Sequence, residues 1–290
     1  MIDGIAGSAR LSMGGGPRPG FASLLVWAVL SVMLACLACG AALAAEVADL
    51  YQAKVLVTGQ RPETRLPALE RGLADVLVKL SGDPDILGDP AAAGPMRKAE
   101  AYVDSFRYRD LMEGIPVHDE QGTRDRPYEL TIDFAPRKID GVLRQLGRES
   151  WTGARPRLAV LLAVEFDEVT YLLAADGGRG RDQRESLATA AWKYGLPIVL
   201  PTAQALAASG LTVGNLESAD GDKVETVLKE TGGDAGLVGR LTWSREALGW
   251  IAEWRLGPDR WQVRGVNFDE AFRNAMSGAL RSLSGHGAPR

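Results

Sequence analysis

The chain has 290 residues, with 33 Lys and Arg against 37 Asp and Glu, two His and two Cys, and a formal net charge of −4. Apolar residues make up 46% and charged residues 24%, which is typical of folded soluble domains and excludes a disordered, collagenous or multi-pass membrane protein. The slightly acidic balance gives no electrostatic reason to expect nucleic acid, which normally meets a basic surface. The length suggests one or two domains.

The first 45 residues have the three-part pattern of a secretory signal peptide. Arg10 and Arg18 precede an uncharged stretch over residues 21–45, which contains the small-x-small triplet Ala42-Leu43-Ala44 near its end. A basic start, an apolar middle and a small-residue exit are the features that signal peptidase requires. We therefore expect residues 1–45 to be cleaved and the mature protein to be periplasmic.

Alternatives to cleavage stay open for this segment. Residues 21–45 could stay as an inner-membrane anchor, because about 20 apolar residues span a bilayer. Cys36 or Cys39 could instead be acylated in a lipoprotein. The sequence also leaves open whether translation starts at Met1 or Met13.

A mature chain without residues 1–45 would be poorly equipped for catalysis. The removed segment holds two Arg, one Asp and both Cys, which leaves 31 positive and 36 negative residues and a net charge of −5. Disulfides, thiol nucleophiles and thiolate metal sites are then excluded. His118 and His286 have no Ser nucleophile or ligand partner at an informative spacing. We expect no catalytic residues, cofactor or metal.

A first domain is expected over residues 46–150. Alternating and helical apolar patterns predict its elements. In chain order these are a strand at Leu50–Val57, a helix with apolar positions from Leu66 to Leu80 and a C-cap at Gly82, a short helix at Ala91–Ala101, an antiparallel strand pair at Tyr102–Met112 and Pro127–Ala135, and a helix around Ile139–Leu146.

A second domain is expected over residues 155–284, after a Gly/Pro turn at Trp151–Pro156 and before a disordered tail at 285–290. Its predicted elements are a doubly buried strand at Leu158–Phe166, helices at Arg181–Tyr194, Thr202–Ala208 and Lys223–Thr231, strands at Ile198–Leu200, Ala235–Trp243, Gly249–Leu256 and Arg260–Gly265, and a final helix capped by Asn267. The fold class is α+β, with two small α/β sandwich-like units that contain mixed or antiparallel sheets.

Several stretches resemble a known family. Leu73–Asp83, Ala101–Arg109, Arg155–Leu162, Gly195–Pro201 and Gly233–Leu241 are similar, in this order, to bacterial envelope proteins of domain of unknown function family 2066. The second half is also similar to periplasmic adaptor domains such as the N-terminal domain of the Tol-system translocation protein. The resemblance implies an exported protein without assigned activity, and the adaptor likeness implies an envelope protein as partner.

Arg107 and Arg109 are the first candidate binding residues. They alternate with Phe106 and Tyr108 on one predicted strand. Arginines next to tyrosine can bind phosphate or carboxylate groups. In the alternative interpretation the aromatic rings face the core, and the arginines pair with neighbouring Asp and Glu side chains.

Four tryptophans are the second candidate surface. Trp243, Trp250, Trp254 and Trp261 lie within one 19-residue span of the predicted strand meander. Trp250 and Trp254 share a face by the two-residue period, with Trp243 across the turn. An exposed row would stack on sugars or form a protein hot spot. A buried row would pack beneath the terminal helix.

Asp83, Asp85 and Asp89 could supply oxygen ligands to calcium, but the spacing lacks the ordered series of an EF-hand loop, and a solvated turn is favoured. The sequence thus favours a non-catalytic binding or adaptor protein of the cell envelope. The alternatives are a glycan or small-molecule binder and a cell-wall hydrolase that uses paired carboxylates.

Overall fold

The computed structural model describes residues 50–115, 118–119, 122–123, 126–219, 221–287 and 289. The predicted signal peptide, the alternative anchor and the two cysteines lie outside the described residues. The chain from Val47 to Arg290 forms one compact unit. Within the described ranges, no helix has both the length and the apolar character that a membrane crossing requires.

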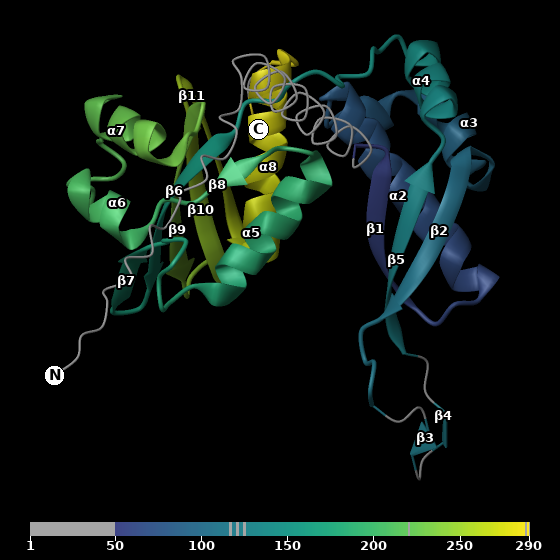
Figure 1. Ribbon diagram of the computed structural model, residues 1–290, viewed down its shortest axis with the longest axis horizontal. Coiled ribbons are helices and arrows are strands. Elements are labelled where there is room, and N and C mark those ends of the chain that lie inside the picture. The colour runs from purple at the N-terminus through teal and green to yellow at the C-terminus, as the bar shows by residue number, and fades with distance from the viewer. Residues whose placement is uncertain are drawn as a thin grey trace, which may run out of the picture. The chain divides into compact units, whose positions relative to one another are not determined.

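The chain is an α+β protein with a three-stranded and a six-stranded sheet, as predicted (Figure 1). The first sheet has the order β1-β5-β2, and both strand pairs are antiparallel. Its strands are β1 (Gln52–Thr58), β5 (Pro127–Phe134) and β2 (Val103–Asp110), and the connection between β2 and β5 contains the short strands β3 (His118–Asp119) and β4 (Gly122–Thr123). The expected β2–β5 pair is therefore confirmed.

Helix α2 (Pro62–Ser81) covers one face of the first sheet. Its apolar positions at helical spacing pack on the inward residues of β1 and β5, such as Val55 and Ile132. Gly82 ends the helix in the left-handed conformation, with φ of 69°, as expected for a glycine C-cap. Helix α4 (Pro136–Gln145) adds Ile139 to the same core.

The short helix expected at Ala91–Ala101 is not continuous. This region consists of the 3₁₀ turns η1 (Ile86–Gly88), η2 (Pro90–Ala92) and η3 (Ala99–Tyr102), with the single-turn helix α3 (Ala93–Met96) between the last two. Pro95 has no amide hydrogen to donate to the carbonyl of Ala91, so a continuous helix that begins at Ala91 is interrupted at this position.

The second sheet has the order β11-β10-β9-β6-β7, with β8 also paired to β6. Strands β6 and β9 are parallel, whereas β9, β10 and β11 form an antiparallel meander. The bounds are β6 (Leu158–Phe166), β7 (Val169–Leu172), β8 (Ile198–Val199), β9 (Ala235–Ser244), β10 (Gly249–Leu256) and β11 (Asp259–Val266). Strand β7, which forms a hairpin with β6, was not expected from the sequence.

Helices lie on both faces of this sheet (Figure 1). Helices α5 (Arg181–Tyr194) and α8 (Phe268–Ser284) cover one face, while α6 (Ala203–Ala208) and α7 (Gly221–Thr231) cover β6 and β9 on the other. Residues 158–164 of β6 are accordingly buried on both faces, as the apolar run predicted. The side of β10 and β11 beyond α6 and α7 stays largely open, because Glu253, Arg260 and Gln262 are exposed.

The predicted linker Trp151–Pro156 is anchored between the two sheets. Arg155 is buried and donates to carbonyl oxygens of Lys79 in α2 and of Tyr194 in α5. Both sheets belong to the compact unit Val47–Arg290. The division into separate domains over 46–150 and 155–284, and the disordered tail, stay predictions.

Candidate functional site

The four tryptophans of the predicted binding surface lie mainly in the core. Trp250, Trp254 and Trp261 are 7%, 2% and 6% exposed, and Trp243 is half-buried and pairs with Trp250 across β9 and β10. The row faces α8, where the ring centroids of Trp254 and Phe272 lie 6.2 Å apart. Packing beneath the terminal helix, which the sequence left open, is the observed arrangement. The alternative of an exposed aromatic row does not apply to these three buried rings.

Arg107 and Arg109 lie on the edge strand β2 with exposed side chains. They form ion pairs with the neighbouring strand β5, Arg107 with Asp133 at 3.1 Å and Arg109 with Glu129 at 3.2 Å. The hydrogen bond that Arg109 donates to the Glu129 carboxylate raises the pKa of the Arg109 guanidinium. The Phe106 side chain is not buried in the core, because the residue is 43% exposed. A binding role for the two arginines stays a prediction, because such exposed pairs are common on solvated faces.

In the loop that contains Asp83, Asp85 and Asp89, two of the aspartates form ion pairs with arginine side chains of this chain. Asp83 accepts from Arg148 at 2.9 Å, and Asp85 pairs with Arg281 at 2.9 Å. These contacts engage both carboxylates, so neither is free to join a calcium site. In the described part of the chain, no three His, Cys, Asp or Glu side chains gather in a metal-binding group. The side chain of His118 lies outside that part.

A groove with a volume of about 830 Å³ runs along the free edge of β1, and we call it the β1 groove. Its walls come from β1, α2, α5 and the first turns of α8, with Glu129 of β5 and Leu111 after β2 also lining it. The lining residues are Ala53, Lys54, Val55, Leu56, Arg71, Ala74, Asp75, Lys79, Leu111, Glu129, Ser186, Ala188, Thr189, Ala190, Trp192, Lys193, Asp269 and Arg273.

The main chain of β1 presents hydrogen-bonding groups to this groove. Strand β1 has β5 on one side only, because it is first in the sheet order. The amide of Phe134 donates to the carbonyl of Tyr51, so the odd-numbered residues of β1 face β5. Alternate residues of an antiparallel strand turn their main-chain groups to opposite sides. Lys54 and Leu56 therefore direct their N–H and C=O groups away from β5, toward the groove.

A buried lysine closes one end of the β1 groove. Lys79 of α2 is 1% exposed, and its Nζ donates to the carbonyl of Gln52 at 2.9 Å. The same ammonium lies 4.1 Å from the centroid of the Trp192 ring, and Lys54 Nζ lies 4.8 Å from it. These cation–π contacts hold α5 beside the beginning of β1.

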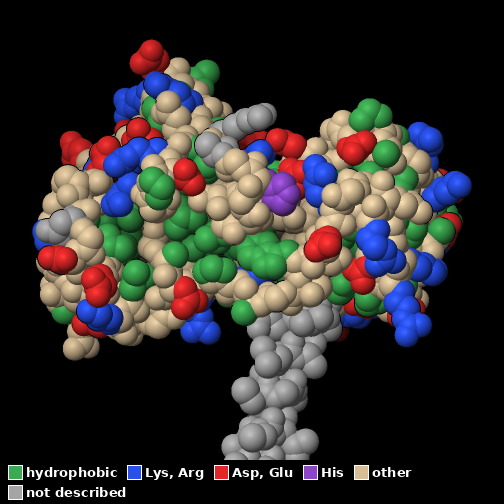
Figure 2. Space-filling view, turned by 90° about the horizontal axis from the view of Figure 1, so that it is seen from above, with side chains coloured by type: hydrophobic (Ala, Val, Ile, Leu, Met, Phe, Trp, Pro, Cys, Tyr) green, Lys and Arg blue, Asp and Glu red, His purple; other side chains and the backbone are tan. Residues whose placement is uncertain are grey.

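Positive side chains outnumber negative ones in the groove, with five basic and three acidic lining residues. The carboxylates are already engaged. Asp75 pairs with Lys193 at 2.9 Å and Glu129 with Arg109 at 3.2 Å, while Asp269 accepts a hydroxyl hydrogen bond. The local field therefore favours an acidic occupant. On the face drawn in Figure 2, by contrast, basic and acidic side chains are interspersed, so no single-sign field covers that face.

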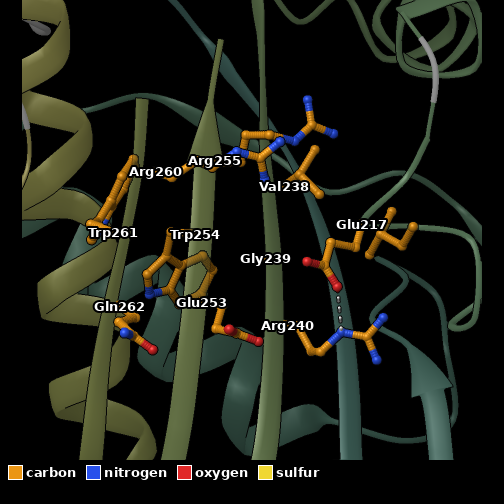
Figure 3. Close-up of a pocket in the computed structure, with 11 residues that line it drawn as sticks. Glu217, Val238, Gly239, Arg240, Glu253, Trp254, Arg255, Arg260, Trp261 and Gln262 are labelled. Atoms are coloured by element: carbon orange, nitrogen blue, oxygen red, sulfur yellow. Dashed lines mark ion pairs between the residues drawn. The ribbon is translucent and has the colours of Figure 1, made fainter. Parts of the chain in front are cut away.

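A second, smaller pocket of about 360 Å³ lies on the meander β9–β10–β11, and we call it the meander pocket (Figure 3). Its lining residues are Leu216, Glu217, Val238, Gly239, Arg240, Glu253, Trp254, Arg255, Arg260, Trp261 and Gln262. Arg255 and Arg260 are direct cross-strand partners. Because side chains alternate along a strand, the pocket's arginines lie on the face opposite to that of the tryptophan row.

The Arg255–Arg260 pair was not predicted, although the sequence contains a signal for it. Both residues are two positions from the turn residues Gly257 and Pro258, so a two-residue hairpin places them opposite each other. The position of β1 at a sheet edge has no comparable local signal. It depends on pairing with β5, about 75 residues further along the chain.

The family described as Domain of unknown function (DUF8605) matches residues 44–152, which include α2 and all strands of the first sheet. This match overturns the resemblance to family 2066, and nothing supports the Tol-like adaptor domain. The stretches that carried the resemblance are short segments of helices, strands and the turns beside them, and such segments recur in unrelated folds. No curated protein matches the chain.

Proposed function

We propose that this chain is a non-catalytic binding protein of the cell envelope that takes an extended, acidic segment of a partner protein along the free edge of β1. The observation that carries the proposal is the orientation of Lys54 and Leu56, whose main-chain groups face the β1 groove. An added strand pairs with such groups and gains affinity from main-chain hydrogen bonds. The predicted export signal at residues 1–45 is the reason for the envelope location.

The groove offers specificity as well as main-chain pairing. A paired strand lies about 4.8 Å from its neighbour, so the segment would run between β1 and α5. Leu56 is 65% exposed and Leu111 is 42% exposed, and both line the groove. Side chains on one face of the segment would therefore meet Lys54 and Leu56, and those on the other face would meet α2 at Arg71 and Ala74.

The charge of the groove selects an acidic segment over a second copy of this chain. Lys54, Arg71 and Arg273 make no ion pair with any described residue. Edge-to-edge pairing of two β1 strands would place two sets of these cations together, and like charges across a strand pair are destabilising. An acidic partner would neutralise them and associate faster at low salt.

A pair of substitutions at one position tests the proposal. Leu56→Pro removes an amide hydrogen that points into the groove, and it leaves the hydrogen bonds to β5 in place, since proline is tolerated on edge strands. Leu56→Thr changes the same side chain and keeps the amide. The probe is a blocked peptide of alternating Glu and Val with seven residues, the length of β1.

We expect Leu56→Pro to weaken peptide binding by at least about tenfold, the effect of one lost hydrogen bond at the upper end of its usual range. Leu56→Thr should stay within about threefold of the unmodified protein, as it removes only part of one apolar contact. Equal binding by all three proteins, or equal loss in both variants, would refute strand addition at β1. Cooperative unfolding of both variants verifies that they fold.

The other functions predicted from the sequence have weaker support. A glycan binder that stacks sugars on the tryptophan row would need exposed rings, and three of the four are buried. A hydrolase would need a pair of free carboxylates in a pocket. In the meander pocket, the Glu217 carboxylate lies 3.9 Å from the Arg240 guanidinium, so it is not a free carboxylate.

A further inference from the structure

We infer that the meander pocket binds the oxyanion of a small ligand, a carboxylate or a phosphate, between Arg255 and Arg260. This site lies on the second sheet, and the inference does not depend on the proposed strand addition at β1.

The register of the meander brings two positive charges together. Arg255 on β10 is directly opposite Arg260 on β11, and its partner on β9 is the uncharged Val238. The carboxylate of Glu253 belongs to the next row, where its cross-strand partners are Arg240 and Gln262. Like charges directly opposite each other destabilise a strand pair. An anion between the two guanidinium groups would remove this repulsion.

The donors for such an anion are in place. The Nε and Nη2 atoms of Arg255 are buried and have no hydrogen-bond partner among the described residues. Arg260 forms no ion pair with any described side chain, and both residues line the same pocket. Buried N–H groups are nearly always hydrogen-bonded in folded proteins. The planar fork of a guanidinium group matches two oxygens of a carboxylate or phosphate.

The third arginine of the pocket shows how this protein neutralises a guanidinium group on the same sheet. Arg240 binds the Glu165 carboxylate, donates to the carbonyl of Val213 at 3.1 Å and lies near Glu217, as the dashed line in Figure 3 indicates. Arg255 and Arg260 have no such partners in the described part of the chain. This contrast within one pocket points to an external anion.

The shape of the pocket limits the ligand to a small molecule. Its volume of about 360 Å³ is near the lower end of the range for small-molecule sites. Leu216 and Val238 give it an apolar wall beside the arginines. A ligand with a compact apolar body and one acidic group satisfies both parts.

Calorimetric titration with two probes, inorganic phosphate and butanoate, tests the inference and separates its two chemistries. Arg255→Gln and Arg260→Gln should each weaken binding of the better probe by at least about tenfold, the effect of losing a charge-assisted hydrogen bond. The matched control is Arg264→Gln, on the same face of β11 but outside the pocket lining. It should change the affinity by less than about twofold, because exposed charges act weakly at a distance.

Tight binding of phosphate alone would identify a phosphorylated ligand, and tight binding of butanoate alone a carboxylic acid; either result supports the site. Failure of both probes to bind at about 50 mM, a concentration above even weak specific affinities, would overturn the inference. An equal loss in Arg264→Gln would also overturn it, since it would show non-specific attraction. Arg260 is exposed, so its variant should fold even if Arg255→Gln does not.

Discussion

Arg155→Met removes a buried guanidinium group that binds four main-chain carbonyls. Arg155 is 9% exposed. Its Nη2 donates to Lys79 at 2.6 Å and to Trp151 at 2.9 Å, and its Nη1 donates to Tyr194 and Gly195 at 3.1 Å each. The group also lies 4.3 Å from the centroid of the Trp151 ring. Two of the acceptors belong to the last turns of α2 and α5, where carbonyls lack partners within the helix.

The size of the expected loss in unfolding free energy follows from these contacts. A hydrogen bond from a charged donor contributes about 1.5–3 kcal/mol, which gives about 6–12 kcal/mol for four such bonds. Part of this is offset, because the variant no longer carries the cost of desolvating a guanidinium group. Removal of one partner from a buried charged interaction destabilises by about 3–5 kcal/mol, and we expect a loss in this range.

Urea denaturation followed by tryptophan fluorescence measures this loss. Arg155→Lys keeps the charge but reaches fewer carbonyls, so its loss should be smaller. The control is Arg157→Met, whose side chain is exposed and which should stay within about 0.5 kcal/mol of the unmodified protein. Because Arg155 connects α2 with α5, two walls of the β1 groove, Arg155→Met should also weaken peptide binding. A loss below about 1 kcal/mol, less than one charged hydrogen bond, would refute the reasoning.

Four further substitutions test the core, the surface and the pH dependence of stability. Trp254→Ala should lower the free energy of unfolding by about 3–5 kcal/mol in urea, and a loss under about 1 kcal/mol would place the ring outside the core. Arg107→Ala and Arg109→Ala should each change it by at most about 1 kcal/mol, because both ion pairs are exposed. Burial and the hydrogen bond to Asp140 raise the pKa of Tyr51 to about 12. The folded state therefore favours the neutral phenol, so this stabilisation is complete below pH 10 and is lost as pH rises from about 10 to about 12. Tyr51→Phe should lack that part of the alkaline loss in pH-dependent denaturation.

The sequence predicted those elements whose signals are local. The C-cap at Gly82 depends on one residue and its backbone conformation. The side chain of Asn267 accepts from the amide of Glu270 at 2.8 Å, as the capping spacing predicted. The apolar run from Leu158 to Val164 likewise identified a strand buried on both faces.

The features that define the candidate sites depend on pairing between distant segments. The alternation over Gln52–Thr58 predicts a strand, but it does not indicate that one edge of this strand stays free beside α5. The same limit applies to the tryptophan row. Periodicity placed Trp250 and Trp254 on one face, and only the packing of α8 decides that this face is buried. The separation of arginines from tryptophans onto opposite faces could have been derived from the hairpin register.

Residue-resolved amide hydrogen exchange of β1, with and without the Glu/Val peptide, is the most direct test of strand addition. The amides of Ala53 and Val55 face β5, so they should exchange slowly in both samples. The amides of Lys54 and Leu56 should exchange fast in the free protein and at least about tenfold more slowly with peptide, as expected when an edge strand gains a partner. No slowing at Lys54 and Leu56 under saturating peptide would contradict the proposed function.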